Sequence, residues 1–257
     1  MTGDYILRVV SNKRIAHDLY DMAAELDAPE NFSPMPGQFA HIAAHGVFLR
    51  RPISIAGYDR NSRRVRFFVR AVGRGTGTIT SMSPGDATKA LLPLGNPFPV
   101  EPANGADVWL VGGGMGVAPL VYAAQCICGA GNGRAKNTTK SFIGFREKDD
   151  IFGERELASY GEVSTETGGF VTDLVKDALI FGRPDVIFAC GPTPMLASLQ
   201  KICREENLKA YVSLEARMGC GIGACLVCNC RKNVEDAEYL RVCKDGPVFD
   251  ISEVELS

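Results

Sequence analysis

The chain of 257 residues carries a formal net charge of −2 at pH 7, and 46% of its residues are hydrophobic. A domain usually has roughly 100–200 residues, so this length predicts two or three domains. The balanced charge excludes a basic surface for nucleic acid, and no run of about 20 apolar residues is present to span a membrane. The first four residues lack the basic and apolar regions of a secretory signal. We therefore expect a cytoplasmic protein with no nucleic acid partner and no membrane association.

Residues 1–102 are expected to form an antiparallel β-barrel domain. They lack long helical periods, and the turn sequences Pro36-Gly37, Pro84-Gly85 and Gly95-Asn96-Pro97 interrupt them. Short apolar or alternating runs lie between these turns, at residues 5–10, 38–43, 52–56 and 65–69. Many short strands separated by glycine and proline turns are typical of small barrels.

Two segments of the predicted barrel carry groups suited to phosphate. The sequence Arg50-Arg51-Pro52-Ile53-Ser54 combines guanidinium groups with a hydroxyl that can reach a ring nitrogen. Arg70 and the glycine-rich segment 73–78 offer a second phosphate cradle, with a helix start available. A basic surface strand followed by a flexible loop explains the same residues, and the local sequence leaves this alternative open.

Residues 103–214 are expected to form an α/β nucleotide domain. Strands are predicted at residues 107–111, 141–145, 162–165, 185–190 and 208–214, and helices at 117–128, 171–179 and 194–206. Pro119 falls in the first turn of its helix, where proline is tolerated. Strands that alternate with helices predict a doubly wound parallel sheet. The glycine-rich residues 129–134 are interpreted as a surface linker.

Two turns of this domain are candidates for binding a nucleotide. The first follows a strand and begins a helix, so its N–H groups and the helix dipole can meet a phosphate; it contains Gly112, Gly113, Gly114, Met115 and Gly116. This turn is not the full G-x-G-x-x-G pattern, and a plain strand-to-helix turn remains an alternative. The second, Cys190-Gly191-Pro192, ends a predicted parallel strand, at the edge where open sheets bind ligands.

Four cysteines near the end of the chain have the spacing of metal ligands. Cys220, Cys225 and Cys228 form a C-x4-C-x2-C pattern, and Cys243 follows fifteen residues after Cys228. This is the ligand pattern of a plant-type [2Fe–2S] cluster. A structural zinc site and ordinary buried cysteines are the alternatives. Cys230 is left over in this count and is interpreted as a bystander or as a thiol near the cluster.

Residues 215–257 are expected to form a small cluster-binding domain. A piece of this size buries too little apolar surface to fold alone, so the cluster and docking onto the α/β domain must hold it together. Cys126 and Cys128 lie in a predicted helix, where packing explains them. The three histidines, at positions 17, 41 and 45, show no metal-binding spacing and are assigned no role.

The combined motifs resemble those of a known superfamily over nearly the whole chain. Arg51-Pro52-Ile53-Ser54, Gly75-Thr76, the glycine turn and Cys190-Gly191-Pro192 occur in the order typical of the ferredoxin–NADP reductase superfamily. The tail, residues 215–225 and 241–249, is similar to the PyrK family, the electron-transfer subunits of dihydroorotate dehydrogenase B. That tail is the most specific motif in the chain.

The resemblance implies a set of cofactor-binding residues. FAD is expected at Arg51, Pro52, Ile53, Ser54, Phe68, Val69, Arg70, Gly75 and Thr76. NAD(H) is expected at Gly112, Gly113, Gly114, Met115, Gly116, Cys190, Gly191 and Pro192, with Ser54 and Cys190 as the catalytic residues. A [2Fe–2S] cluster is expected at Cys220, Cys225, Cys228 and Cys243. Ile53 departs from the family pattern, because many relatives carry an aromatic residue there to stack on the flavin.

The resemblance also implies a function. The chain would pass electrons between NAD(H), FAD and the cluster, and on to the FMN of a separate subunit that interconverts dihydroorotate and orotate in pyrimidine biosynthesis. A heterotetramer with two copies of each subunit is expected. NAD is expected over NADP, mainly from the family and because residues 145–150 mix charges of both signs. The alternatives are a related flavin and iron–sulfur NAD(P)H reductase subunit that serves a hydrogenase, a sulfide-linked reductase or another dehydrogenase, and a zinc-stabilised interaction module without enzymatic activity.

Overall fold

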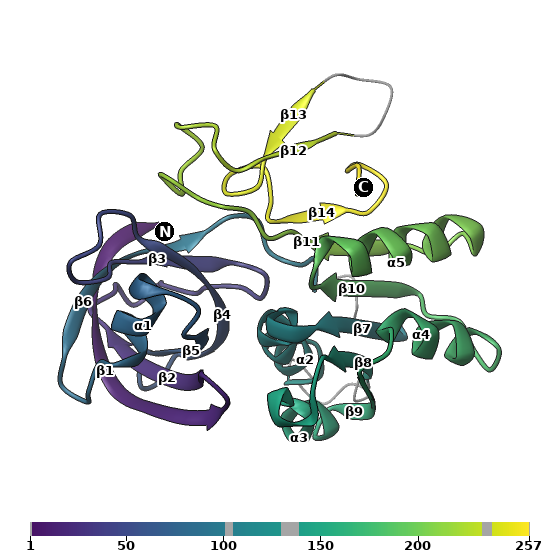
Figure 1. Cartoon of the computed structure of the whole chain (residues 1–257), viewed down its shortest axis with the longest axis horizontal. Coiled ribbons are helices and arrows are strands. Elements are labelled where there is room, and N and C mark those ends of the chain that lie inside the picture. The colour runs from purple at the N-terminus through teal and green to yellow at the C-terminus, as the bar shows by residue number, and fades with distance from the viewer. Residues whose placement is uncertain (1, 101–104, 130–138, 233–237, 257) are drawn as a thin grey trace.

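The N-terminal strands close into an antiparallel barrel (Figure 1). The computed structural model describes residues 2–100, 105–129, 139–232 and 238–256. The barrel strands are β1 (Gly3–Ala16), β2 (Leu19–Leu26), β3 (Phe39–Ile42), β4 (Arg51–Asp59), β5 (Arg64–Arg70) and β6 (Ala87–Leu94). They pair in the order β1-β2-β5-β4-β3-β6, and β6 closes onto β1. The predicted barrel is therefore confirmed.

The alternation of side chains along β3 explains how the barrel meets the rest of the molecule. Ala40 and Ile42 belong to the core inside the barrel, whereas Phe39 belongs to the core shared with the α/β sheet. Successive side chains of a strand point to opposite faces. One face of β3 therefore fills the barrel, and its other face is directed at the remaining domains.

Helix α1 (Arg74–Thr80) begins in the glycine-rich segment after β5, where a helix start was predicted and a flexible loop was the alternative. Its sequence, rich in glycine and threonine, has weak intrinsic helix propensity. Ile79 is fully buried in the barrel core, and this contact supplies what the local sequence lacks.

The second unit is a six-stranded sheet that is mixed rather than parallel. Its order is β14-β11-β10-β7-β8-β9, with strands β7 (Val108–Gly113), β8 (Thr139–Phe145), β9 (Gly161–Thr167), β10 (Val186–Cys190), β11 (Ala210–Ser213) and β14 (Val248–Asp250). Strands β7 to β11 pair in parallel as predicted, but β14 is antiparallel to β11. The parallel sheet predicted for residues 103–214 is confirmed, and β14 adds an antiparallel edge to it, because this strand comes from the C-terminal segment and needs no crossover helix.

Helices cover both faces of this sheet, as expected for a doubly wound fold (Figure 1). The helices are α2 (Val117–Gly129), α3 (Glu154–Ala158), α4 (Val171–Leu179) and α5 (Thr193–Glu205), with two 3₁₀ turns, η2 (Gly114–Gly116) and η3 (Lys148–Asp150). Val108 and Leu110 of β7 pack with α2 and α3, whereas Trp109 and Val111 pack with α4 and α5. Helix α3 was not predicted. Gly129 ends α2, and residues 130–134 of the expected linker lie outside the described residues.

The barrel and the sheet are joined by packing and by ion pairs. Helix α2 lies against β4, and the Tyr122 hydroxyl of α2 donates to the carbonyl of Pro34 at 2.7 Å. Arg66 of β5 pairs with Asp21 of the barrel at 2.7 Å and with Glu156 of α3 at 2.6 Å. Because the Arg66 guanidinium pairs with a carboxylate of each unit, these ion pairs fix the relative position of the barrel and the sheet.

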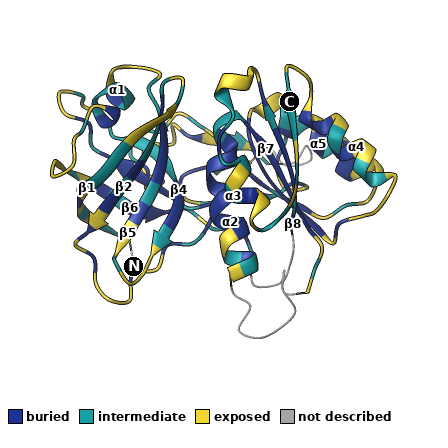
Figure 2. Cartoon of the chain, turned by 90° about the horizontal axis from the view of Figure 1, so that it is seen from below, coloured by how far each residue is buried: buried dark blue, intermediate teal, exposed yellow. Residues whose placement is uncertain are grey.

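The C-terminal segment docks on the sheet and shares its core. It contains a hairpin of β12 (Asn229–Arg231) and β13 (Tyr239–Arg241), followed by β14. Cys228, Val242 and Cys243 are buried with Phe249 in the core that α4 and α5 also cover. Figure 2 shows the buried residues concentrated in the barrel strands and in the sheet between its helices. Residues 233–237 of this segment lie outside the described residues.

Across the described ranges, no helix is long and apolar enough to cross a membrane.

Candidate functional site

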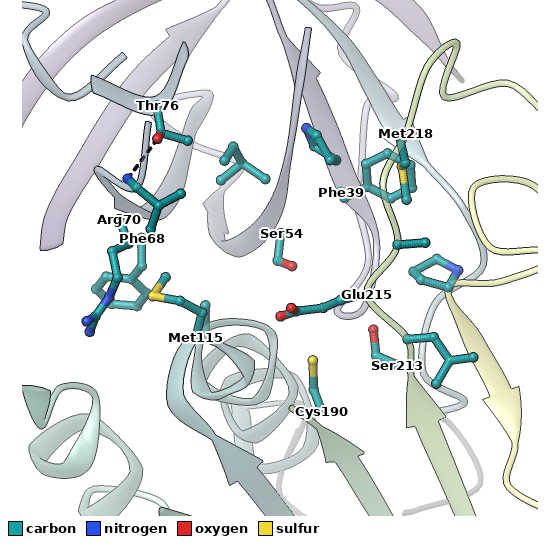
Figure 3. Close-up of a pocket in the computed structure, with 17 residues that line it drawn as sticks. Phe39, Ser54, Phe68, Arg70, Thr76, Met115, Cys190, Ser213, Glu215 and Met218 are labelled. Carbon is teal, nitrogen blue, oxygen red and sulfur yellow. Dashed lines mark hydrogen bonds between the residues drawn. The ribbon is translucent and has the colours of Figure 1, made fainter. Parts of the chain in front are cut away.

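A cavity of about 350 Å³ lies where the barrel, the sheet and the C-terminal segment meet (Figure 3). It brings together eight of the residues predicted to bind flavin or nucleotide: Pro52, Ile53, Ser54, Phe68, Arg70, Thr76, Met115 and Cys190. Figure 3 shows that Ser54, Cys190 and Glu215 enter it from different elements. Residues far apart in the sequence therefore form one site.

The cavity has apolar walls with a few polar groups directed into it. Phe39 and Phe68 are aromatic and nearly fully buried, and Met115 adds a thioether. Arg70 holds a buried Nε that has no hydrogen-bond partner among the described residues. A planar, largely apolar ligand with an anionic group fits this environment, since its anion would satisfy that donor. The residues therefore fit a flavin.

Ile53 does not leave the cavity without aromatic side chains. Phe39 stands opposite Ser54 in the β3–β4 register, and Phe68 lies on β5. Both line the cavity together with Ile53. Aromatic rings from neighbouring strands therefore lie in the same cavity as Ile53. Phe68 was predicted from the sequence, but Phe39 was not, because the pairing of β3 with β4 is a tertiary contact.

Some residues predicted to bind FAD do not line the cavity. Val69 is fully buried in the barrel core, because it alternates with Phe68 along β5. Arg51 turns away, and its Nη1 donates to the Leu49 carbonyl at 2.7 Å. Its guanidinium lies against Gly75, where a Cβ would come within 2.6 Å of Cζ.

Glu215 is a residue of this cavity that the sequence analysis did not assign. It lies two residues past the end of β11 and lines the cavity with Ser213 and Cys190. The Glu215 carboxyl is exposed to solvent. The protein atoms around it nevertheless remove part of its hydration, which raises its pKa. Burial likewise raises the pKa of the Cys190 thiol, with the Glu215 charge adding to the effect. The position of Glu215 at the carboxyl end of a parallel strand was the signal that could have identified it.

A second cavity of about 700 Å³ runs along the carboxyl ends of β7, β8 and β10. The predicted nucleotide residues Gly113, Gly114 and Pro192 line it, together with Arg146 of the segment after β8. Open α/β sheets bind nucleotides at this edge. Arg70 and Met115 line both cavities, so the two sites adjoin.

The remaining predicted nucleotide residues, Gly112, Gly116 and Gly191, line neither cavity. Gly112 allows α2 to pack closely on β7, and Gly116 and Gly191 allow the ends of β7 and β10 to approach each other. A Cβ on Gly116 would collide with the carbonyl of Cys190, and a Cβ on Gly191 would lie 3.0 Å from the Gly113 nitrogen. The tight-turn interpretation is therefore compatible with a binding role, since close packing brings Gly113 and Pro192 to the same cavity.

The four predicted cluster ligands lie in two pairs. The Cys220 and Cys225 thiols interact with each other on the accessible side, and the Cys228 and Cys243 thiols do so in the interior. In the described parts of the chain, no three His, Cys, Asp or Glu side chains converge closely enough to hold a single metal ion. Two thiol pairs fit a group with two metal atoms better than they fit one zinc ion.

Backbone N–H groups point at all four of these sulfurs. The amides of Ile222, Ala224 and Cys225 donate to Cys220 Sγ at 3.3–3.4 Å. Cys225 Sγ accepts from the Cys220 amide at 3.4 Å, Cys243 Sγ from Gly223 at 3.1 Å, and Cys228 Sγ from Cys243 at 3.4 Å. Such donors stabilise thiolates, which are the form that binds metal.

The pKa values of the thiols differ between the accessible pair and the buried pair. Burial raises the pKa of Cys220, but the amides of Ile222 and Cys225 with the other donors more than offset it and lower the value to about 6. For Cys243, burial and the Cys228 thiol raise the pKa to about 12. The leftover Cys230 lies on β12, and burial with the nearby Cys228 raises its pKa to about 11.

Asp245 supports the turn that carries Cys243. Its carboxylate accepts two bonds from the Arg241 guanidinium at 2.8 and 2.9 Å, and a third from the Arg241 amide at 2.8 Å. The Asp245 carbonyl accepts a bond from Asn96 Nδ2 of the barrel at 2.7 Å. The Arg241 hydrogen bond holds the pKa of Asp245 below its ordinary value.

We expect Asp245→Asn to destabilise the protein at pH 7 by about 1 kcal/mol, because a charge-assisted pair is lost at a partly exposed site. The pKa of Asp245 is lower in the folded state than its ordinary value of 3.8. Its contribution is therefore complete above that value and lost as the pH falls below it. Urea unfolding at several pH values measures the difference from wild type, which should shrink in acid. Asp177→Asn, at an exposed position of α4, is the control, and an equal loss there would contradict the prediction.

The barrel, the mixed sheet and the cavity between them define the architecture of the ferredoxin reductase class, here extended by a four-cysteine segment. Residues 215–255 match the family described as the iron-sulfur cluster binding domain of dihydroorotate dehydrogenase B. The structure of an NADH-dependent reduced ferredoxin–NADP oxidoreductase is 29% identical, with a TM-score of 0.84 over 97% of this chain and 90% of that one.

Full-length relatives carry a more specific name. The chain is 39% identical to the electron transfer subunit of dihydroorotate dehydrogenase B (NAD+) from a Geobacillus species, over 97% of this chain and 98% of the relative. It is 40% identical to the subunit of that name from Shouchella clausii, over 97% of each. The chain therefore belongs to the family of dihydroorotate dehydrogenase B electron transfer subunits.

Proposed function

We propose that this chain passes electrons between NAD(H), FAD and a [2Fe–2S] cluster, as the electron transfer subunit of a dihydroorotate dehydrogenase in pyrimidine biosynthesis. The observation that carries the proposal is the continuity of the three sites. Arg70 and Met115 line both cavities, and Met218 of the cysteine segment lines the first one. When bound, these groups supply hydride exchange at the flavin and single-electron transport at the cluster.

The residues of the first cavity have distinct roles in this proposal. Ser54 presents a hydroxyl to the flavin ring, and Cys190 forms the opposite wall at the end of β10, where a nicotinamide would enter. The second cavity holds the rest of the dinucleotide along Gly113, Gly114 and Pro192. Met115 and Arg70, at the junction, direct the nicotinamide end towards the flavin. These placements derive from geometry and from the general rule for parallel sheets.

The four thiolates, at positions 220, 225, 228 and 243, hold the cluster. The accessible pair, Cys220 and Cys225, lies next to three exposed apolar side chains, Ile222, Leu226 and Val227. Exposed apolar residues grouped in one segment suit a protein interface. We place the docking surface for the catalytic partner at the loop of residues 218–227. The FMN of that partner and a heterotetramer with two copies of each subunit complete the proposal, and the interconversion of dihydroorotate and orotate belongs to the partner.

NAD(H) is the proposed nicotinamide coenzyme, since the relatives are named for NAD(+). The second cavity contains Arg146, an exposed cation that a 2′-phosphate could use, and the carboxylate of Asp150, which such a phosphate would meet unfavourably. The ratio of kcat/KM for NADH to that for NADPH tests this choice. We also place the protein in the cytoplasm, because cluster thiolates require a reducing compartment.

A second candidate function is that of a related reductase subunit serving a different partner. The similarity to an NADH-dependent reduced ferredoxin–NADP oxidoreductase extends over 97% of this chain and favours it. The same cofactors are involved in both candidates. The difference lies in the protein that docks at residues 218–227, so identification of the copurifying partner separates them.

We expect the purified chain to show flavin bands with broad iron–sulfur absorbance and to reduce a dye with NADH, but not to oxidise dihydroorotate with NAD+. The physical reason is that the proposal assigns both cavities and the four thiols to electron carriers rather than to dihydroorotate. Adding the catalytic subunit should restore dihydroorotate turnover. Dihydroorotate oxidation by the chain alone would contradict the assignment of that reaction to the catalytic subunit. A colourless protein with stoichiometric zinc would favour the zinc-stabilised interaction module.

A further inference from the structure

His41 is buried between the flavin barrel and the cluster loop, which we define as residues 219–225. Only 2% of its surface is exposed, and its Nε2 has no hydrogen-bond partner among the described residues. The backbone of Gly221 lies directly on the ring. A Cβ at that position would be 2.8 Å from Nδ1, 3.3 Å from Cγ and 3.4 Å from Cε1 of His41. The imidazole therefore forms the surface on which the cluster loop rests.

Gly221 fits this contact for two reasons. Its φ of +73° lies in the left-handed region, which favours glycine, and the imidazole leaves no space for a side chain. The residues before and after Gly221 both belong to the cluster site. Cys220 precedes Gly221, and the amide of Ile222 follows it and donates to Cys220 Sγ at 3.4 Å. A displacement at Gly221 would thus move both a ligand and one of its hydrogen-bond donors.

The strand that carries His41 also forms a wall of the flavin cavity. Phe39 lines that cavity and lies two residues before His41 on β3, so both side chains leave the same face of the strand. On the facing segment, Met218 lines the cavity, and Gly221 lies three residues later. Figure 3 shows Phe39 and Met218 on the same side of the cavity. Strand β3 and the segment 218–221 therefore lie close together at two places. Phe39 and Met218 are near each other at the flavin cavity, and His41 contacts Gly221 at the cluster loop.

The chemistry of the ring suits a fixed contact. The backbone carbonyl groups of Arg50 and Cys220 lie beside it. Both carbonyls are acceptors, one on the barrel side and one on the cluster side, and an imidazole N–H is a donor. A buried ring at this contact therefore favours the position of the loop that leaves its N–H paired over positions that would not.

We propose that His41 is the positioning residue that fixes the cluster loop against the flavin cavity and so sets both the surroundings of the cluster and its electronic coupling to the flavin. This inference rests on the proposed function, because it requires one electron to leave the reduced flavin and to be gained by the cluster. The rate of such a transfer falls steeply with the distance between the two carriers. The hydrogen bonds and packing around the sulfurs set the reduction potential of the cluster.

The test compares His41→Phe, His41→Ala and His41→Asn with His17→Phe. Phenylalanine keeps the ring but removes both nitrogens, alanine removes the contact, and asparagine restores an N–H donor. His17 is exposed and lies beyond the end of β1, so its replacement is the matched control. Stopped-flow absorbance follows flavin reduction by NADH and cluster reduction separately. Electron paramagnetic resonance and a redox titration report the environment and the potential of the reduced cluster.

We expect flavin reduction by NADH to stay within about twofold of wild type in every variant. Cluster reduction should slow by about tenfold or more in His41→Phe and His41→Ala, with a shifted resonance signal and potential. Partial recovery is expected in His41→Asn and no change in His17→Phe. Loss of iron with the flavin retained would also support the proposal, since only the loop would have been released.

Three results would count against the inference. Cluster kinetics, resonance signal and potential like those of wild type in His41→Phe and His41→Ala would overturn it. Loss of flavin together with iron in all His41 variants would also overturn it, because that pattern indicates general unfolding of the core. A wild-type chain without flavin or iron would refute the proposed function first, and the inference with it.

Discussion

Replacing Cys225 by serine is expected to remove most of the iron from this protein, whereas Cys230→Ser should retain it. Cys225 lies beside the Cys220 thiol, and its sulfur accepts a hydrogen bond from the Cys220 amide at 3.4 Å. Cys230 is two residues past Cys228 on β12 and lies outside the C-x4-C-x2-C set. Loss of a residue that supports a ligand typically lowers metal affinity by about 10–100-fold. Loss of the ligand itself should lower the affinity at least as much.

The two substitutions form a matched pair, because each replaces one sulfur by oxygen in the same segment. Iron and sulfide analysis, with the visible spectrum, measures the outcome. Flavin content serves as an internal control, since the flavin cavity contains neither cysteine. Iron lost from Cys230→Ser and retained in Cys225→Ser would reassign the ligands.

The spacing of the cysteines was sufficient to predict the cluster segment, because metal ligation there is nearly local in sequence. Cys220, Cys225 and Cys228 fall within nine residues, and the amides that donate to Cys220 and Cys225 belong to the same loop. The segments around Ser54 and Cys190 were predicted for a similar reason, since each lies on or at the end of one strand. Motifs of this kind carry most of their geometry in a short stretch of chain.

The residues that the sequence did not reveal are placed by contacts between distant segments. Phe39 reaches the flavin cavity through pairing of β3 with β4, and Glu215 reaches it from the end of β11. His41 gains its position from a loop 180 residues further along the chain. No local pattern encodes these contacts. Val69 is the opposite case: it was predicted to bind FAD together with Phe68, although side chains alternate along a strand and only one of the two can face the cavity.

The fold shows the same division between local and non-local information. Helix and strand periods predicted the α/β alternation, and turn residues predicted the barrel. The antiparallel strand β14 was visible only as a short apolar run near the end of the chain. Its pairing with β11 depends on the docking of the C-terminal segment, which the Leu214 amide secures by donating to the Pro247 carbonyl at 2.9 Å. Register between such distant segments is set by the packed core rather than by propensity.

Gly116→Ala is expected to disable the nucleotide site while leaving the cluster intact. A Cβ on Gly116 would collide with the carbonyl of Cys190 and lie 2.7 Å from the Gly191 nitrogen. These are backbone atoms, which cannot move aside as a flexible side chain would, so the end of β7 must shift away from β10. Overpacking of this kind costs about 1–3 kcal/mol of stability. A displacement near 1 Å of a positioned group can reduce catalysis by about a hundredfold.

The measurement is kcat/KM for NADH with a dye acceptor, together with the cluster spectrum and the midpoint of urea unfolding. Gly129→Ala is the control, since a Cβ at that glycine, the last residue of α2, meets nothing within 4 Å. We expect the spectrum of the cluster to survive in Gly116→Ala, because its thiols lie on a different segment, and only the reduction by NADH to fail. The pattern is the reverse of that expected for Cys225→Ser, in which NADH still reduces the flavin but the cluster is lost. Wild-type NADH kinetics in Gly116→Ala would contradict the argument, since they would mean that the junction of β7 and β10 does not position the nicotinamide.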